Sequence, residues 1–348
     1  VVIVDGSIAT APLTLDAFEA AFDGDDTFTG GTGSFDTINM QATAGDADLT
    51  GVTGFEFINV SDALSPSEAV SITTADENVG AGEILTITSS QQDTLAGGLT
   101  LDATAEADNG AFNVTGSWYN DTITTMGGDD VIFTSIGNDI VDAGDGNNVV
   151  TVGANFPGFF EFDGTNVVTT GSGNDIINGG SSSALGDTDT LNSGAGMDTI
   201  NGFGGVDIID AGDDDDTVYG GTGMDQITGG LGADTLYGEA DADTFFYTTL
   251  LESSDATLDT IMDFVSGEDK VDVSAFAVAS FVGNGTDALD TTGRLTGAVE
   301  AVFELQTDTL WVNLDGNTSL DGNDLRIILT GVGDTGGLAV DGSDLVLS

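Results

Sequence analysis

Apolar residues recur at a nine-residue spacing through the middle of the chain. Each of them lies two residues after an aspartate or asparagine, among threonine, glycine and other small residues. A short extended segment with one central apolar residue, followed by a glycine-rich stretch, predicts a short strand with an inward side chain and then a turn. The apolar positions are Ile123, Ile132, Val141, Val150, Val168, Ile177, Leu191, Ile200, Ile209, Val218, Ile227, Leu236 and Phe245.

Carboxylates and glycines keep the same frame. Two steps are irregular, because GANFPGFFEF lies within a step of eighteen residues and an insertion within GGSSSALGD adds five residues to another. The carboxylate position holds Asp121, Asp130, Asp139, Asn148, Asn166, Asp175, Asp189, Asp198, Asp207, Asp216, Asp225, Asp234 and Asp243. Two residues earlier stand Gly128, Gly137, Gly146, Gly164, Gly173, Gly196, Gly205, Gly223 and Gly232. Glycine permits the backbone angles that such turns need.

This frame resembles the G-G-x-G-x-D-x-U-x repeat of repeats-in-toxin (RTX) proteins, and the resemblance implies a parallel β-roll that binds several calcium ions. Two nonapeptides form one coil, so carboxylates eighteen residues apart stack on the same side. Calcium prefers oxygen ligands, which we expect the aspartates and the turn carbonyls to supply. The turn ligands would come from Gly128, Gly137, Gly173, Gly196, Gly205, Gly223 and Gly232.

Counting in steps of eighteen predicts two rows of ligands. One row would hold Asp121, Asp139, Asp175, Asp198, Asp216 and Asp234. The other would hold Asp130, Asn148, Asn166, Asp189, Asp207, Asp225 and Asp243. Asparagine offers a carbonyl oxygen without a charge, so we expect weak or empty sites around Asn148 and Asn166.

The net charge of -57 changes the picture in two ways. The chain has 60 acidic residues against Lys270, Arg294 and Arg326, so it repels nucleic acid and needs cations to become compact. It has 39% hydrophobic residues, too many for an acidic disordered tail. Without cysteine or histidine it can form neither disulfides nor histidine-dependent catalytic triads and zinc sites. No transmembrane stretch and no Sec-type signal are visible.

The flanking sequences predict an all-β chain of three regions. Residues 1–110 form a β-rich part, as a β-helix or sandwich, with an isolated pair of RTX-like turns at Asp26 and Asp36, and they resemble secreted surface-layer and adhesin-type proteins. Residues 111–246 form the calcium-binding β-roll. Residues 247–348 form a β-rich cap that resembles the C-terminal domain of serralysin-type secreted proteases. That resemblance implies a calcium ligand at Asp263, a final hairpin at 310–331 and a type I secretion-like tail, DGSDLVLS.

The protease activity of that family does not carry over, because its H-E-x-x-H motif needs histidine. DGNTSLDGND (315–324) fits a hairpin turn better than a calcium loop. Trp118, Tyr119 and Trp311 fit packing better than a carbohydrate platform. GANFPGFFEF is either a loop folded onto the roll or an apolar patch that docks a neighbour; GGSSSALGD is interpreted as a surface insertion.

These features favour a secreted, non-enzymatic surface protein that uses calcium to self-assemble into a surface layer, filament or matrix. Its partners would be calcium, further copies of the chain and the type I secretion machinery, with no nucleic acid. Two alternatives stay open. One is a non-catalytic RTX secretion and folding module of a larger enzyme or toxin, and the other is a calcium-dependent adhesin.

Overall fold

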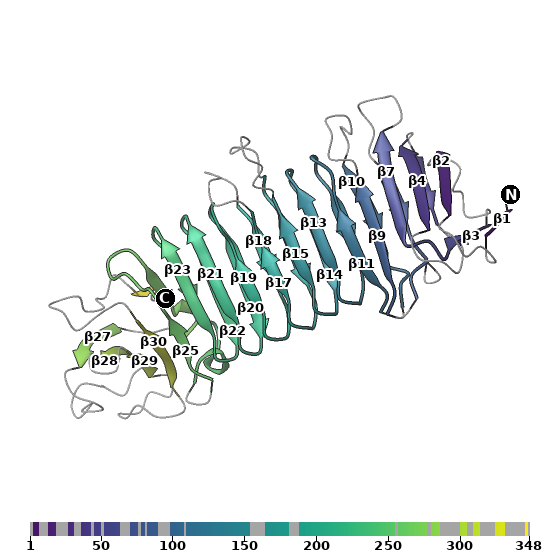
Figure 1. Cartoon of the computed structure of the whole chain (residues 1–348). Coiled ribbons are helices and arrows are strands. Elements are labelled where there is room, and N and C mark those ends of the chain that lie inside the picture. The colour runs from purple at the N-terminus through teal and green to yellow at the C-terminus, as the bar shows by residue number, and fades with distance from the viewer. Residues whose placement is uncertain are drawn as a thin grey trace. The chain divides into compact units, whose positions relative to one another are not determined.

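The computed structural model divides the protein into two compact units, Val1–Ala184 and Leu185–Ser348, called the first and second unit below. Strands dominate both (Figure 1). Among the described residues the helices are the 3-10 turns η2 (Leu250–Glu252) and η3 (Ser274–Phe276). The structure describes residues 3–6, 13–18, 27–30, 36–42, 45–49, 52–62, 70–75, 78–80, 82–89, 98–107, 109–153, 164–180, 188–254, 257–276, 280–285, 300–304, 309–313, 324–330 and 345–346.

In the first unit the chain passes back and forth between two parallel sheets. One sheet contains, in spatial order, β2 (Thr14–Phe18), β4 (Thr37–Ala42), β7 (Phe57–Asp62), β9 (Ile84–Ser89), β11 (Ala111–Thr115), β13 (Val131–Ser135), β15 (Val149–Val152) and β17 (Ile176–Asn178). The other contains β5 (Gly45–Asp48), β8 (Val70–Thr73), β10 (Leu99–Asp102), β12 (Thr122–Thr124), β14 (Ile140–Gly144) and β16 (Val167–Thr170). A third, small sheet contains β1 (Ile3–Asp5), β3 (Thr27–Thr29) and β6 (Val52–Thr53).

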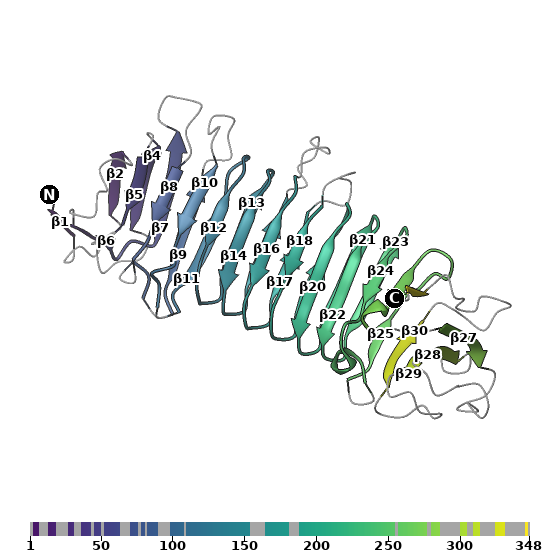
Figure 2. The same ribbon diagram turned by 180° about the vertical axis from the view of Figure 1, so that it is seen from behind.

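The second unit has the same alternation between two sheets and ends in a hairpin region (Figure 2). One sheet contains β18 (Thr190–Asn192), β20 (Ile208–Asp213), β22 (Gln226–Leu231), β24 (Thr244–Phe246), β26 (Lys270–Asp272) and β31 (Leu345–Val346). The other contains β19 (Thr199–Asn201), β21 (Thr217–Thr222), β23 (Thr235–Ala240), β25 (Asp259–Ile261), β30 (Leu325–Leu329), β29 (Thr309–Asn313), β28 (Glu300–Glu304) and β27 (Ser280–Gly285).

The apolar residue of each repeat forms the core between the two sheets. In the second unit, Ile200, Val218 and Leu236 are directly paired neighbours on successive strands, and all three are buried. All thirteen predicted inward positions are buried. Burial of one such side chain contributes about 1.5–3 kcal/mol, so the stability of this core depends on the number of coils stacked.

The predicted fold class is confirmed: the chain is all-β and its repeats form a parallel β-roll. In the N-terminal part the described strand pairs are also parallel, as in a β-helix and unlike the antiparallel sheets of a sandwich. The β9–β11–β13 ladder crosses residue 110 without interruption. The boundaries at residues 110 and 246 stay predictions.

The end of the chain contains the expected hairpin. Strands β29 and β30 pair antiparallel, and Trp311 is buried with the Arg326 guanidinium 5.0 Å above its ring, which agrees with a packing role. The tail strand β31 pairs with β26 through Val271–Leu345 and Asp272–Val346. Asp26, most of GANFPGFFEF (154–162), most of GGSSSALGD (181–187) and most of DGNTSLDGND (315–323) lie outside the described residues.

Candidate calcium sites

The repeat aspartates form hydrogen-bonded ladders at the edges of the second unit. Asp207 Oδ1 accepts the backbone N–H of Asp189 at 2.9 Å, and Asp225 Oδ1 accepts that of Asp207 at 2.9 Å. Asp243 continues this row. On the opposite edge Asp216 Oδ1 accepts the N–H of Asp198 at 2.8 Å, and Asp234 continues that row. Carboxylates eighteen residues apart are therefore stacked, as the frame predicts for this unit.

Both rows extend beyond the glycine repeats to two residues that sequence reasoning missed. Asp259 Oδ1 accepts the N–H of Asp234 at 3.0 Å, and Asp269 Oδ1 accepts that of Asp243 at 3.0 Å. Asp259 has no turn glycine before it and Asp269 has only Gly267, two residues earlier with positive φ, but the apolar residues Ile261 and Val271 still follow two positions later. An aspartate followed two residues later by an apolar residue was therefore the sequence signal that could have identified Asp259 and Asp269.

Asp263, expected at a last calcium site, holds a turn. Its Oδ1 accepts the N–H of Gly238 at 3.0 Å and its Oδ2 accepts that of Glu239 at 2.9 Å. One carboxylate thus fixes two backbone donors of the neighbouring coil. Its role as a calcium ligand stays a prediction.

In the first unit the predicted division into rows is wrong. Asn166 stacks on Asp139, whose N–H it accepts at 3.0 Å, and Asp175 stacks on Asn148, whose N–H it accepts at 2.6 Å. The eighteen-residue step between Asn148 and Asn166 covers one passage from β15 to β16 and is nine residues longer than one repeat. Counting it as two repeats exchanged the rows. The rows are Asp121, Asp139 and Asn166 on one edge and Asp130, Asn148 and Asp175 on the other.

Asp36 belongs to a related arrangement near the N-terminus. It is fully buried, and its Oδ1 accepts the N–H of Leu13 at 2.7 Å. Its own N–H donates to Glu56 Oε2 at 2.6 Å. The coil-to-coil bond is therefore retained with glutamate in place of aspartate and without the nine-residue spacing.

The hypothesis that the rows bind calcium rests on the second carboxylate oxygen, Oδ2, of the row aspartates. In the second unit the Oδ2 atoms of Asp216, Asp225, Asp234 and Asp243 are buried and accept no hydrogen bond from the described residues. A buried charged oxygen without a partner is costly unless a cation compensates it. The same oxygen explains one glycine: a Cβ on Gly220 would lie 2.7 Å from Asp225 Oδ2.

The electrostatics of these carboxyls point the same way. Burial raises the pKa of Asp216 and that of Asp243 to about 8, and neighbouring carboxylates contribute to both increases. Burial likewise raises the pKa of Asp225 and that of Asp234 to about 6. Without a cation the roll therefore favours protonated carboxyls, and a bound cation would restore the charged form.

The turns bring backbone oxygens close to these carboxylates. All seven glycines predicted as turn ligands have positive φ, and a Cβ on Gly223 would lie 1.4 Å from the carbonyl oxygen of Gly205. Successive turns thus stack in van der Waals contact. Within the described residues no three acidic side chains converge on a metal-sized site. A calcium ion here would combine one or two carboxylates with turn carbonyls, a donor set that suits this cation.

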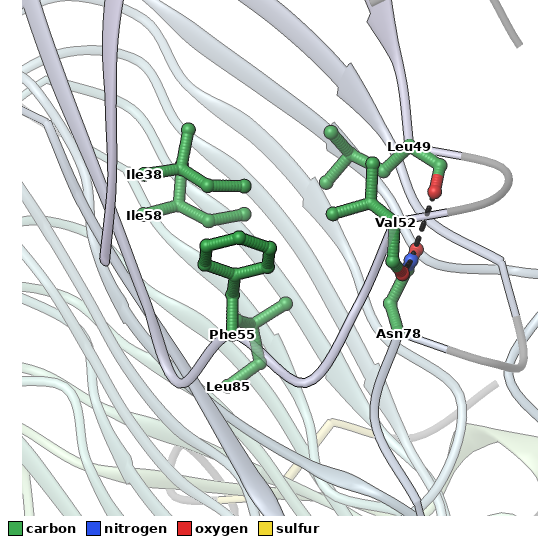
Figure 3. Close-up of a pocket in the computed structure, with 7 residues that line it drawn as sticks. All are labelled: Ile38, Leu49, Val52, Phe55, Ile58, Asn78 and Leu85. Atoms are coloured by element: carbon green, nitrogen blue, oxygen red, sulfur yellow. Dashed lines mark hydrogen bonds between the residues drawn. The ribbon is translucent and has the colours of Figure 1, made fainter. Parts of the chain in front are cut away.

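A small pocket in the first unit is not a rival site. It is lined by Ile38, Leu49, Val52, Phe55, Ile58, Asn78 and Leu85 (Figure 3). Its volume of about 10 Å³ is at the lower limit for holding a single water molecule. Asn78 Nδ2 donates to the carbonyls of Leu49 and Val52, so the only polar side chain already has protein partners.

Stacked Asp-glycine turns at the edges of a parallel β-roll define an RTX-type repeat domain. The family model of the serralysin C-terminal domain of M10 peptidases matches residues 24–336. The chain therefore belongs to the serralysin C-terminal family, whose calcium-binding repeats form a non-catalytic part of secreted proteins. No curated protein matches the chain. No helix in the described parts is long and apolar enough to cross a membrane.

Proposed function

We propose that this chain is a structural module of a secreted protein, and that calcium binding at the repeat turns drives its folding. The supporting observation is the set of buried Oδ2 atoms in the two rows, at Asp216 and Asp234 on one edge and at Asp225 and Asp243 on the other, each without a hydrogen-bond donor in the described structure. Calcium supplies the missing positive charge and bridges neighbouring coils. The chain contributes the scaffold and performs no chemical reaction itself.

A calcium titration of the metal-stripped chain tests this proposal. Far-ultraviolet circular dichroism should report a cooperative gain of β structure, and calorimetry should give several ions per chain. Magnesium at the same concentration is the control, because its smaller ion requires stricter octahedral geometry and loses water reluctantly. Unchanged secondary structure and no bound calcium would refute the proposal.

The finer part of the proposal is that calcium-loaded copies associate. Apolar side chains are exposed on the outer faces of the first unit, with Val131 at 46% and Ile140 at 52% exposure. With a net charge of -57, copies repel each other until cations neutralise them. Sedimentation velocity in chelator and then in millimolar calcium should show large particles only with calcium.

The second candidate is a folding and secretion module of a larger enzyme or toxin. It is favoured by the family match, since that family is named for the C-terminal part of a peptidase. Under this alternative the calcium-loaded chain would sediment as a compact monomer. The same sedimentation experiment therefore separates the two candidates, while the titration tests the calcium requirement that they share.

A further inference from the structure

Asn148 differs from Asp216, Asp225, Asp234 and Asp243 because its side chain donates hydrogen bonds within its own turn. The residue is fully buried. Its Nδ2 donates to the carbonyl oxygens of Gly144 at 3.0 Å and Gly146 at 3.2 Å. Its Oδ1 accepts the N–H of Asp130 at 3.0 Å. Both amide hydrogens and the amide oxygen therefore have protein partners.

The glycines bound by Asn148 occupy the turn positions that surround each proposed calcium site. Gly144 and Gly146 precede Asn148 by four and two residues, as Gly221 and Gly223 precede Asp225. All four glycines have positive φ, so the two turns share their backbone type. The atom of Asp225 equivalent to Nδ2 is Oδ2, which is buried without a donor. The oxygen of an ionised carboxylate cannot donate to turn carbonyls, whereas the amide does.

We infer that the Asn148 amide takes the place of a calcium ion in its turn. The turn at 144–148 is closed to calcium and is held together without it. This inference rests on the proposed function, because it assumes that the aspartate turns bind calcium. The inference goes further than the expectation of a weak calcium site at Asn148. The amide donates two hydrogen bonds to carbonyls that an ion would otherwise bridge, and it thereby replaces the metal.

Exposed side chains beside Asn148 connect the same coils without metal. Asn147 donates from its backbone N–H to Asp129 Oδ1 at 2.8 Å and from Nδ2 to the same atom at 3.0 Å. Asn174 then donates its N–H to Asn147 Oδ1 at 2.9 Å. Three consecutive turns on this edge are thus joined directly. Together with Asn148 they form a calcium-independent segment within the first unit.

Exchanging amide and carboxylate in both directions tests the inference. The variants are Asn148→Asp and, as the matched opposite, Asp225→Asn in the second unit. Calcium per chain is counted by calorimetry on metal-stripped protein, and calcium-free order is measured by hydrogen–deuterium exchange of peptides covering β14 and β15. Asn148→Asp should add calcium binding and make calcium-free exchange of these strands about tenfold faster or more, because two hydrogen bonds are lost. Asp225→Asn should reduce the calcium count.

Asn148→Ala keeps the experiment decisive if Asn148→Asp fails to fold. It removes the amide without adding a carboxylate, so calcium-free exchange of β14 and β15 should accelerate while the calcium count stays at the wild-type value. An unchanged count in a folded Asn148→Asp variant, or unchanged calcium-free exchange in Asn148→Ala, would overturn the inference. A wild-type chain that binds no calcium would instead refute the proposed function.

Discussion

The turns of the two units share one frame but differ at the residue just before the row position. In the first unit this residue is polar at Asn120, Asp129, Asn138, Asn147 and Asn174. In the second unit it is apolar at Met197, Val206, Met224, Ala233 and Ala242 but polar at Thr188 and Asp215, and Asp215 Oδ1 accepts the N–H of Ala233 at 2.9 Å. The polar side chains bond to the next coil, as when Asn138 donates its N–H to Asn120 Oδ1 at 3.0 Å. The apolar side chains offer no comparable acceptor.

This difference teaches that one repeat frame can encode two degrees of calcium dependence. Burial raises row pKa values in both units, to about 7 at Asp130 in the first and to about 8 at Asp216 and Asp243 in the second. In the first unit, asparagine side chains form hydrogen bonds between neighbouring coils, and two row positions are uncharged asparagines. In the second unit the described row positions are all aspartates. We therefore expect the second unit to depend on the ion more strongly than the first.

Calcium removal should produce the largest contrast. In chelator, hydrogen–deuterium exchange of β20 to β24 should accelerate by roughly a hundredfold or more, since several buried carboxylates lose their counterions together. Exchange of β13 to β15 should accelerate clearly less. Mass spectrometry of peptides from the two units measures both in one sample. Equal acceleration in the two units would contradict the comparison.

Substitution within one row should have the next largest effect. Asp207→Ala combined with Asp225→Ala removes two adjacent row carboxylates, so calcium affinity should fall roughly tenfold or more, at least as much as for loss of an outer-shell partner. Isothermal calorimetry measures it. Asn148→Ala is the matched control and should leave the affinity of the remaining sites unchanged. Wild-type affinity in the double variant would show that this row does not bind the ion.

The metal-free chain should become less stable as pH rises, with the strongest effect in the second unit. The folded pKa of Asp216 and that of Asp243 are raised from 3.8 to about 8, so the folded state binds more protons than the unfolded state between these values. Stability then falls with increasing pH up to about 8, by as much as tenfold per pH unit for each such group. Exchange at pH 6 and pH 8, corrected for intrinsic rates, measures this. Saturating calcium should abolish the trend.

Relief of backbone strain should give the smallest effect. Glu239 has a φ of 70° at a position where the neighbouring repeats have glycine. Glu239→Gly should stabilise the calcium-loaded chain by about 1 kcal/mol, because a left-handed conformation is costly for a residue with a Cβ. Urea unfolding in saturating calcium measures it. Glu239→Ala removes the same charge but keeps the Cβ, so an equal gain there would assign the effect to charge.

The repeat spacing in the sequence predicted the inward residues and the stacked aspartates of the second unit. Prediction from spacing failed where an insertion made the repeat count ambiguous. Inward residues such as Val218 and the stacking of Asp207 on Asp189 follow from an uninterrupted period of nine. The rows of the first unit did not, because an insertion of nine residues before Asn166 has the same length as one repeat. Asp259 and Asp269 were missed because the glycine pattern is absent before Asp259 and reduced to Gly267 before Asp269. The hydrogen bonds of Asn148 depend on rotamers that no spacing reveals.

Strand pairing within each unit has a consequence for how order spreads. Among the described strands, a repeat strand such as β21 pairs with the strand one coil before it, β19, and the strand one coil after it, β23. Such a stack behaves as a one-dimensional chain of nearest-neighbour couplings. A coil that holds together without an ion is then a nucleus, and each ion captured beside it extends the ordered stretch by one step. The steepness of folding as a function of calcium concentration would then depend on the number of coils that become ordered from that nucleus.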